Sequence, residues 1–293
     1  MRAVTSVSVV IPARNEGANL VDTVRSVLTH SDWSPLEVIV VDDGSTDGSP
    51  RRAAALDRDR VRLVRGQEMG VAGARNHGAE HAQGEILVFL DGHCYVPPGW
   101  LKPLIDALAT SGAALAGPAF TNIFDTRMQA CGITWRDAGL DNVWLPVGAQ
   151  VEPVPFHIGA CQAVRAEVFR QVGGYDRGMT QWGSEDIELC LRLWLLGHQV
   201  VAQPASLVYH LFRTSRPYDV DVDQVVYNKL RVVLLHCDGP RLARVLQPML
   251  AYAGIERSLA RIFDGDTLDD RRRLFAQRVH DMDWFCARFG LDI

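Results

Sequence analysis

Short apolar runs alternate with amphipathic stretches along the N-terminal third of the chain. The runs are rich in β-branched residues and predict strands buried on both faces, at residues 7–11, 36–41, 61–64 and 87–90. The stretches between them predict helices at residues 20–28, 51–56 and 77–81, and Asn19 or Asp22 is expected to cap the first. This alternation predicts a parallel sheet with right-handed crossovers, which binds its ligands at the carboxyl ends of its strands.

The pattern becomes less regular after the fourth run. A helix is expected at residues 101–108 and a strand at residues 113–120. Residues 121–157 show no clear period, and we expect an antiparallel excursion or a loop that covers the ligand. Trp135 and Trp144 lie within it, either packed in the core or stacked on a ligand.

Apolar residues recur at helical spacing from about residue 226 to the last residue. We therefore expect a main domain over residues 1–225 and a helical C-terminal extension over residues 226–293. The extension packs as a subdomain, forms a dimer contact, caps a binding site of the main domain or lies on a membrane surface, and the sequence leaves these alternatives open. No apolar run reaches the roughly 18 residues of a transmembrane helix, and no apolar segment typical of a signal peptide precedes the first strand.

Composition and charge narrow the choice of function. The chain has 293 residues, 47% of them hydrophobic, which suits one large globular unit with an appendage. Its 30 basic and 35 acidic side chains give a net charge of −5, which argues against a nucleic-acid binder because such a protein needs a basic face. The six cysteines are scattered, without a Cys-x-x-Cys pair, so we expect reduced thiols and a cytoplasmic protein.

The run at 87–90 leads directly into Asp91-Gly92-His93. In extended backbone the side chains of Asp91 and His93 point to the same side, so both can reach one divalent ion. Gly92 between them lets a ligand approach the backbone closely. One carboxylate and one imidazole with open positions suit an ion that also binds phosphate oxygens. Taken alone, such a tripeptide is more often a polar turn than a metal site. The residues at the neighbouring strand ends decide between these two interpretations.

The ends of two other predicted strands carry polar and acidic residues as well. Asn15 and Glu16 follow the first strand, and Asp42 and Asp43 follow the second. With Asp91 they suggest a nucleotide clamp, in which Asp43 accepts the imide N–H of a uracil ring and Glu16 accepts ribose hydroxyls. Asp42 and Asp43 also suit a helix cap or turn, and the two roles are compatible. The Gly-rich turns of dinucleotide-binding and P-loop proteins are absent, which argues against those classes.

Segments of the sequence resemble motifs of the family 2 GT-A glycosyltransferases. They are VVIPARNE (9–16), VVDDGSTD (40–47), GARN (73–76) and FLDGH (89–93), and the likeness covers roughly residues 6–215. The resemblance implies the GT-A fold, an α/β fold with a Rossmann-like nucleotide-binding sheet and a mixed acceptor-side extension. It also implies a glycosyltransferase with a nucleotide-sugar donor and a divalent ion. The Asp-x-His metal motif is similar to that of the polypeptide N-acetylgalactosaminyltransferases, since the usual family 2 form is Asp-x-Asp.

The resemblance assigns roles to individual residues. The donor-binding residues that it implies are Pro12, Ala13, Asn15, Glu16, Asp43, Gly73, Arg75, Asn76, Asp91, Gly92, Gly159, Trp182, Arg213 and Tyr218. Arg75 pairs either with a phosphate or with a neighbouring carboxylate.

Residues 209–213 are similar to a segment that supplies a third metal ligand and a mobile lid in the N-acetylgalactosaminyltransferases. The likeness points to His210 as the third ligand beside Asp91 and His93, to Arg213 on the diphosphate, and to a lid at residues 211–225. Two imidazoles and one carboxylate favour Mn²⁺ over Mg²⁺, because Mg²⁺ prefers an all-oxygen shell.

Glu185 and Asp186 resemble the Glu-Asp pair of inverting GT-A enzymes, whose second acid is the general base. We therefore expect inverting transfer of a hexose or N-acetylhexosamine from a UDP-sugar, with Asp186 as the base and Glu185 on a sugar or acceptor hydroxyl. The retaining N-acetylgalactosaminyltransferases usually have Asn at the second position, so Asp186 departs from them. Ser184 and the acids that follow also suit a capped helix start.

The sequence leaves several alternatives open. Retaining transfer to a peptide, as in the N-acetylgalactosaminyltransferases, is the first. A nucleotidyltransferase or pyrophosphorylase is the second, although the Gly-rich basic loop expected of that class is missing, and a non-catalytic sugar-nucleotide binder is the third. The acceptor is a peptide, a saccharide or a small metabolite, and the extension is compatible with a homodimer.

Overall fold

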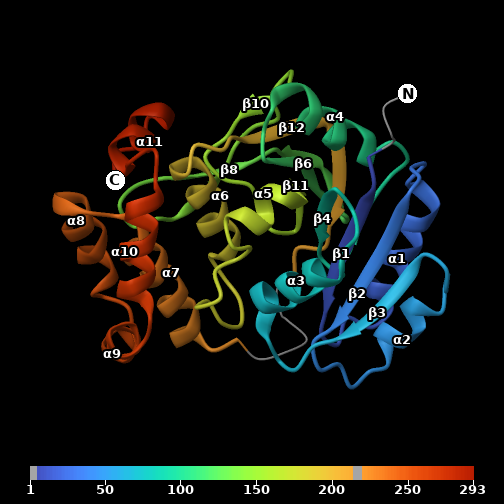
Figure 1. Cartoon of the computed structure of the whole chain (residues 1–293), viewed down its shortest axis with the longest axis horizontal. Coiled ribbons are helices and arrows are strands. Elements are labelled where there is room, and N and C mark those ends of the chain that lie inside the picture. Colours follow the sequence, from blue (N-terminus) through green and yellow to red (C-terminus); the bar gives the residue numbers. More distant parts are fainter. Residues whose placement is uncertain (1–4, 214–219) are drawn as a thin grey trace.

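A computed structural model describes residues 5–213 and 220–293 and places one mixed β-sheet at the centre of the molecule (Figure 1). The spatial order of its strands is β10 (Glu152–Pro153), β12 (Val200–His210), β6 (Leu115–Asn122), β11 (Cys161–Arg165), β4 (Ile86–Leu90), β1 (Val7–Ala13), β2 (Leu36–Asp42) and β3 (Val61–Arg65). Two further strands join this sheet, since β5 (Cys94–Tyr95) pairs with β12 and β7 (Asp125–Ala130) pairs with β6. A separate antiparallel pair is formed by β8 (Ile133–Trp135) and β9 (Asn142–Trp144).

The half of the sheet formed by β3, β2, β1 and β4 is parallel, as the alternation of strands and helices predicts. Val9 of β1 pairs with Val38 on one side and with Val88 on the other. Helices cover both faces, with α1 (Ala18–His30) and α2 (Ser49–Ala54) on one side and α3 (Gly70–His81) on the other. Because both faces are covered, residues 7–11 are all buried, which explains their continuous apolar run.

Helix α3 is longer than its sequence pattern predicts, because its N-terminus is capped from another strand. Asp43, which follows β2, accepts hydrogen bonds from the N–H groups of Met69 (2.7 Å) and Gly70 (2.9 Å). These are among the N–H groups that a helix start leaves without an internal partner. The helix then packs closely on the sheet, since a Cβ at Gly78 would lie 2.3 Å from Cγ1 of Val10.

The two caps predicted from the local sequence are not formed. Helix α1 starts after Gly17, which has a φ of 63° and whose N–H donates to Oδ2 of Asp47 at 2.8 Å, so neither Asn19 nor Asp22 plays the expected role. Ser184 precedes α6 (Glu185–Leu195) with a φ of 67° and makes no side-chain cap hydrogen bond. The start of α1 is therefore fixed by a residue distant in the sequence, whereas at α6 Oε2 of Glu185 accepts the N–H of Gly183.

The other half of the sheet is mixed. β11 runs antiparallel to both β4 and β6, whereas β12 runs parallel to β6. The helices α4 (Leu101–Ser111) and α5 (Ala166–Gln171) pack against this half. Residues 121–157 contain the antiparallel excursion that was expected, because β7 returns along β6 and β8 pairs with β9. Its two tryptophans differ, since Trp135 is buried against Phe156 and Trp144 is 42% exposed.

The C-terminal part of the chain is helical. Its helices are α7 (Val222–His236), α8 (Gly239–Met249), α9 (Ile255–Asp264), α10 (Thr267–Gln277) and α11 (Met282–Phe289). They lie at the end of the molecule opposite α2 and β3 (Figure 1). Leu230 of α7 and Phe285 of α11 belong to the same apolar core as Phe89 of β4, so the helices pack on the sheet as the subdomain alternative proposed. The domain division at residue 225 stays a prediction, and no described helix is long and apolar enough to cross a bilayer.

A buried charged network joins α6 to α7. The carboxylate of Glu188, which is fully buried, accepts hydrogen bonds from Arg192 at 2.7 and 2.8 Å and lies 2.9 Å from Nε2 of His236. Burial alone raises the pKa of Glu188, but the charges and hydrogen bonds of Arg192 and His236 outweigh it and lower the pKa to about 2. The network therefore stabilises the fold only while Glu188 is ionised.

We expect the Glu188→Gln variant to be less stable at neutral pH and to have a weaker pH dependence of stability. The pKa in the folded protein lies below the ordinary value of 4.5, so this contribution is complete above pH 4.5 and is lost as the pH falls toward 2. It is on the order of 3 kcal/mol. Thermal unfolding of both proteins from about pH 7 to about pH 3 measures it. If the stability of the two proteins changed equally with pH, the ion pair of Glu188 would be contradicted.

Candidate active site

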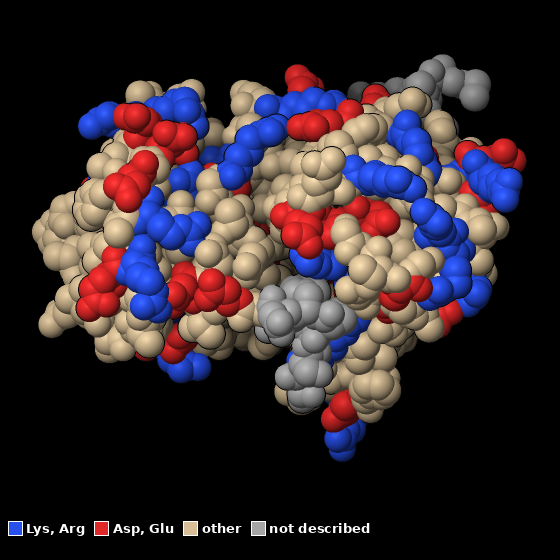
Figure 2. All heavy atoms as spheres, turned by 90° about the horizontal axis from the view of Figure 1, so that it is seen from below, with Lys and Arg blue, Asp and Glu red and all other residues tan. Residues whose placement is uncertain are grey.

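A cleft of about 810 Å³ opens at the carboxyl ends of β1, β2 and β4, where parallel sheets bind ligands. The start of α6 and the end of β12 complete its walls. Carboxylates outnumber arginines in its lining, which contains Glu16, Asp43, Glu68, Asp91, Glu185 and Asp186 beside Arg14, Arg75 and Arg213. Figure 2 shows acidic side chains gathered near the middle of one face, with basic side chains around them. An anionic ligand therefore needs positive charge at defined points of this cleft.

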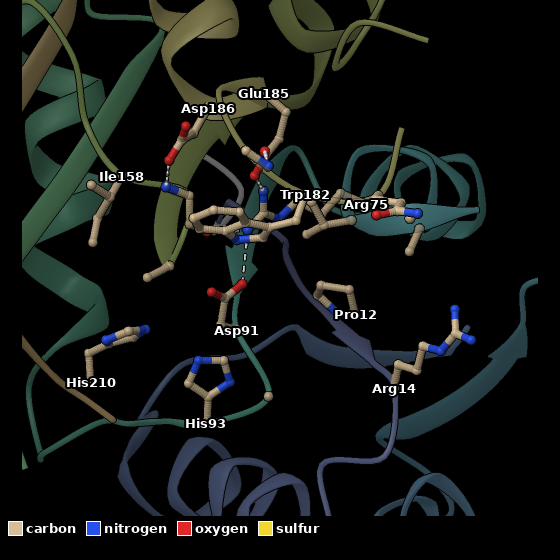
Figure 3. Close-up of a pocket in the computed structure, with 18 of the residues that line it drawn as sticks. Pro12, Arg14, Arg75, Asp91, His93, Ile158, Trp182, Glu185, Asp186 and His210 are labelled. Atoms are coloured by element: carbon tan, nitrogen blue, oxygen red, sulfur yellow. Dashed lines mark hydrogen bonds and ion pairs between the residues drawn. The ribbon is translucent and has the colours of Figure 1, made fainter. Parts of the chain in front are cut away.

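Three potential metal ligands meet in the cleft. Asp91 directly follows β4, His93 lies two residues further, and His210 ends β12. The antiparallel pairing of β5 with β12 places His210 opposite Cys94, the residue next to His93. Ligand atoms of the three side chains lie within 4.8 Å of one another, and in the close-up both histidine rings lie below Asp91 (Figure 3). Strand pairing thus brings together the three residues predicted as ligands.

The protonation state of this cluster suits a cation. Burial by itself raises the pKa of Asp91, but the charges of Arg75, His93 and His210 outweigh it, so the net shift is downward. Burial and then the neighbouring His93 lower the pKa of His210 to about 4. The Nδ1 atoms of His93 and His210 are buried and lack a hydrogen-bond partner among the described residues. An ionised carboxylate and imidazole nitrogens without partners are suitable ligands for a transition-metal ion.

Arg75, which is 2% exposed, connects the metal side of the cleft to the opposite wall. Its Nη2 donates to Oδ1 of Asp91 and to the carbonyl oxygen of Gly159, both at 2.8 Å, and its Nη1 donates to Oε1 of Glu185 at 2.9 Å (Figure 3). The guanidinium also lies over the ring of Tyr175, 5.2 Å from its centre. The sequence left either a phosphate or a neighbouring carboxylate as the partner of Arg75. In the structure Arg75 pairs with the carboxylates of Asp91 and Glu185.

Glu185 and Asp186 are both anchored to the backbone around the cleft. Oε2 of Glu185 accepts the N–H of Gly183 at 2.9 Å. Oδ2 of Asp186 accepts the N–H of Gly159 at 2.7 Å, and its Oδ1 accepts the N–H of Ile187 at 2.8 Å. Burial and then the charge of Glu185 raise the pKa of Asp186 to about 7. Asp186 therefore holds the loop at Gly159 in place.

Glu16 and Arg213 join the loop after β1 to the end of β12. Nη1 of Arg213 lies 3.3 Å from Oε1 of Glu16, and its Nη2 makes a closer contact with Oε2. Nδ1 of His93 also lies 3.3 Å from Oε1 of Glu16, without the geometry of a hydrogen bond. Glu16, which was expected to accept ribose hydroxyls, thus pairs with the guanidinium of Arg213 in this structure.

Most of the residues predicted for donor binding line this cleft. They are Pro12, Ala13, Asn15, Glu16, Asp43, Arg75, Asp91, Gly92, Gly159, Trp182 and Arg213. Gly73 and Asn76 are not among the lining residues. Asn76 is buried and exchanges hydrogen bonds of 2.8 and 2.9 Å with the backbone of Tyr175, and a Cβ at Gly73 would lie 2.7 Å from Cβ of Met69. Tyr218 and residues 214–219 of the predicted lid lie outside the described residues.

Two aromatic side chains border the metal cluster. The sequence left Trp144 as either a core residue or a residue that stacks on a ligand, and it placed Phe212 in the predicted lid without a role of its own. The rings of Trp144 and Phe212 lie 5.9 Å apart, and the ring of Phe212 lies 4.3 Å from that of His210. Both line the cleft and are at least 40% exposed. The position of Phe212 between His210 and Arg213 could have indicated that it borders the site. Nothing in the local sequence shows that Trp144 is exposed in the cleft while Trp135 is buried.

Comparisons with known proteins give the chain a family context. The family model described as Glycosyl transferase family 2 matches residues 8–173, which is more than half of the chain. A second family model, described as N-terminal domain of galactosyltransferase, matches residues 153–214. Polypeptide N-acetylgalactosaminyltransferase 8 of Drosophila melanogaster is 35% identical over 73% of this chain and 39% of its own length. Polypeptide N-acetylgalactosaminyltransferase 6 of Bos taurus is 32% identical over 95% of this chain and 48% of its own. The chain thus spans less than half the length of these curated relatives.

Solved structures confirm the GT-A fold. A crystal structure of GalNAc-T7 with UDP, GalNAc and Mn²⁺ matches this chain with a TM-score of 0.81 at 23% sequence identity. The match covers 99% of this chain and 57% of the GalNAc-T7 chain. The mannosyltransferase PcManGT from Pyrobaculum calidifontis, in complex with GDP-Man and Mn²⁺, has a TM-score of 0.57 at 20% identity and covers 94% of this chain and 75% of its own.

These comparisons correct one expectation. The curated relatives are polypeptide N-acetylgalactosaminyltransferases, which are retaining, so the expectation of inverting transfer with Asp186 as general base is wrong. In the structure both carboxylate oxygens of Asp186 accept backbone N–H groups, so this residue has a structural role. A cytoplasmic location and a homodimer stay predictions.

We expect the Arg75→Leu variant to be strongly destabilised, because it leaves the carboxylates of Asp91 and Glu185 without their cation. Removing one partner of a buried ion pair costs about 3–5 kcal/mol. Arg14→Leu is the matched control, since its ion pair with Glu68 is exposed and is worth less than about 1 kcal/mol. Denaturant unfolding measures both variants, and similar losses in the two would refute the bridging role of Arg75.

Proposed function

The chain belongs to glycosyl transferase family 2, and we propose that it transfers an N-acetylhexosamine from a UDP-sugar to a hydroxyl group of a peptide. The transfer retains the configuration of the sugar and uses Mn²⁺. The observation that carries this proposal is the meeting of Asp91, His93 and His210 in a cleft whose opposite wall carries Glu185. The classes of donor and acceptor rest on the names of the relatives and on the ligands of the GalNAc-T7 structure.

The metal site fits a manganese ion better than a magnesium ion. Two imidazoles and one carboxylate are ligands that Mn²⁺ accepts, whereas Mg²⁺ prefers oxygen ligands. Asp91, His93 and His210 would hold the ion, and their unpartnered imidazole nitrogens favour this role. When bound, such an ion neutralises the charge that develops on a departing diphosphate. Arg213, held by Glu16 next to His93, is placed to add a second positive charge there.

The uridine end of the donor fits the loop after β1 and the end of β2. Asn15, which has a φ of 55°, is fixed there because its Oδ1 accepts the N–H of Thr46 at 2.8 Å. Asp43 caps α3, yet each carboxylate oxygen can accept a second hydrogen bond. Asp43 can therefore accept the imide N–H of uracil while it keeps its structural role.

The sugar end of the donor fits the wall formed by Glu185, Gly159 and Trp182. Hydrogen bonds to Arg75 and to the N–H of Gly183 hold Glu185 in one position. A carboxylate fixed in this way can accept sugar hydroxyls without losing further conformational freedom. The ring of Trp182 is 37% exposed and lies within the cleft, where it offers an apolar surface to the sugar (Figure 3).

Retention requires the acceptor to approach on the face of the sugar from which the diphosphate departs. Trp144 and Phe212 form an aromatic surface beside His210, which is the side proposed for the diphosphate. Such a surface suits the backbone and apolar side chains of a peptide. The acceptor oxygen forms the new bond to the sugar, and its proton passes to an oxygen of the diphosphate as the old bond breaks. This route needs no free carboxylate base on the opposite face.

We expect UDP with Mn²⁺ to raise the melting temperature of the protein and Mn²⁺ to have little effect in the His210→Ala variant. A ligand at about a hundred times its dissociation constant stabilises the native state by about 2.7 kcal/mol. His198→Ala is the control, because His198 lies outside the cleft lining. Differential scanning fluorimetry with UDP, UDP-N-acetylhexosamines and GDP-sugars, with and without Mn²⁺, tests this. A manganese-dependent shift of equal size in His210→Ala and wild type would disprove the metal site.

We also expect the Asp186→Asn variant to keep at least about a tenth of wild-type turnover, whereas losing a general base costs about 10²–10⁴-fold. The amide oxygen of Asn can still accept the N–H of Gly159.

With an α-linked UDP-sugar donor, we expect the anomeric carbon of the sugar in the glycopeptide product to have the α configuration. The NMR signal of its anomeric proton measures this. A β-linked product would contradict retention.

A further inference from the structure

Helix α7 belongs to the C-terminal helices, yet it binds the segment that forms the sugar side of the cleft. Asn228 lies at the centre of this contact and is 1% exposed. Its Nδ2 donates to the carbonyl oxygens of Thr180 at 2.9 Å, Gly183 at 3.0 Å and Trp182 at 3.3 Å. Its Oδ1 accepts the N–H of Thr180 at 3.2 Å. One amide group thus binds four backbone groups of residues 180–183.

Other residues of this helix extend the contact in both directions. At its start, the N–H of Asp221 donates to Oε1 of Gln181 at 3.2 Å. Further along, Arg231 pairs with both carboxylate oxygens of Asp176 at 2.6 and 2.8 Å, and its Nη1 donates to Oγ1 of Thr267 at 2.7 Å. The polar side of α7 therefore follows the connection to α6 along much of its length.

The connection needs this support because of its backbone conformation. Gln181 has a φ of 56°, Gly183 of 108° and Ser184 of 67°. Non-glycine residues rarely adopt such values, and they persist only where surrounding contacts determine the conformation. Trp182 lies between these residues and Glu185 directly follows them, so the positions of both sugar-facing side chains depend on this backbone.

We propose that Asn228 is a positioning residue of the transferase site. It holds the backbone of residues 180–183, and thereby Trp182 and Glu185, where the sugar of the donor binds. The nature of the ligand rests on the proposed function. The metal ligands and the uridine side lie instead at the ends of β1, β2, β4 and β12 or directly after them. Loss of Asn228 therefore weakens binding of the sugar and spares binding of UDP.

The first test compares the affinities of UDP and of a UDP-N-acetylhexosamine, both with Mn²⁺, for Asn228→Ala and for the milder Asn228→Ser, whose hydroxyl keeps one donor. We expect UDP affinity to stay within about twofold, while sugar-nucleotide affinity falls about tenfold and the donor KM rises in parallel, with a smaller change in the serine variant. Val233→Ala is the control, because Val233 is buried on the same helix and contributes to the apolar core. It should lower the melting temperature without separating the two affinities.

A second measurement needs no ligand. Hydrogen exchange of the backbone amides of residues 180–184 should be about tenfold faster in Asn228→Ala than in wild type, with α7 still protected. Unchanged exchange in this segment, or an equal loss of UDP and sugar-nucleotide affinity, would overturn the proposal. If the wild-type protein binds neither UDP nor any UDP-sugar, the proposed function fails, and the exchange measurement still decides whether Asn228 holds the segment.

Discussion

The buried guanidinium of Arg75 joins the parts of the molecule that form the cleft. It binds the carboxylate of Asp91 at the end of β4, the carbonyl oxygen of Gly159 and the carboxylate of Glu185 at the start of α6. Buried carboxylates require such a partner, because an unpaired charge in the interior is strongly unfavourable. The planar fork of arginine fixes direction as well as charge, which a lysine cannot do. One side chain therefore sets the position of a metal ligand and of a sugar-facing acid together.

The two halves of the sheet contribute different parts of the site. The parallel half supplies the nucleotide side, because three of its strands end at the same edge with Asn15, Asp43 and Asp91. The mixed half supplies His210, since the end of β12 pairs with the end of β6 on one side and with β5 on the other. The aromatic surface of Phe212 follows from that same strand end. The third metal ligand and the proposed acceptor side thus have one structural origin.

The parts that the sequence predicted well are those set by local geometry. Apolar runs identified β1 and β4 because both faces of these strands are buried. Asp91 and His93 do meet, but not through the extended backbone that was expected, because Gly92 and His93 lie in a turn closed by the hydrogen bond from the N–H of Cys94 to the carbonyl oxygen of Asp91 at 3.1 Å. The start of α3 was not visible, because its cap, Asp43, comes from another strand. The role of Asp186 was misjudged for a related reason. A carboxylate in a suitable sequence position does not reveal that one of its oxygens accepts a distant backbone N–H group, here that of Gly159.

The contacts of α7 bear on where the functional unit of this protein ends. Asn228 binds the backbone in front of α6, and His236 lies against Glu188 within α6, so α7 holds the helix that begins with Glu185 at two points. A chain cut at the predicted boundary of residue 225 would lack both groups. It would leave the carbonyl oxygens of Thr180, Trp182 and Gly183 and the carboxylate of Glu188 without these partners, and unsatisfied buried polar groups are costly. We therefore propose that α7 belongs functionally to the catalytic domain, although the apolar pattern of the sequence groups it with the helices that follow.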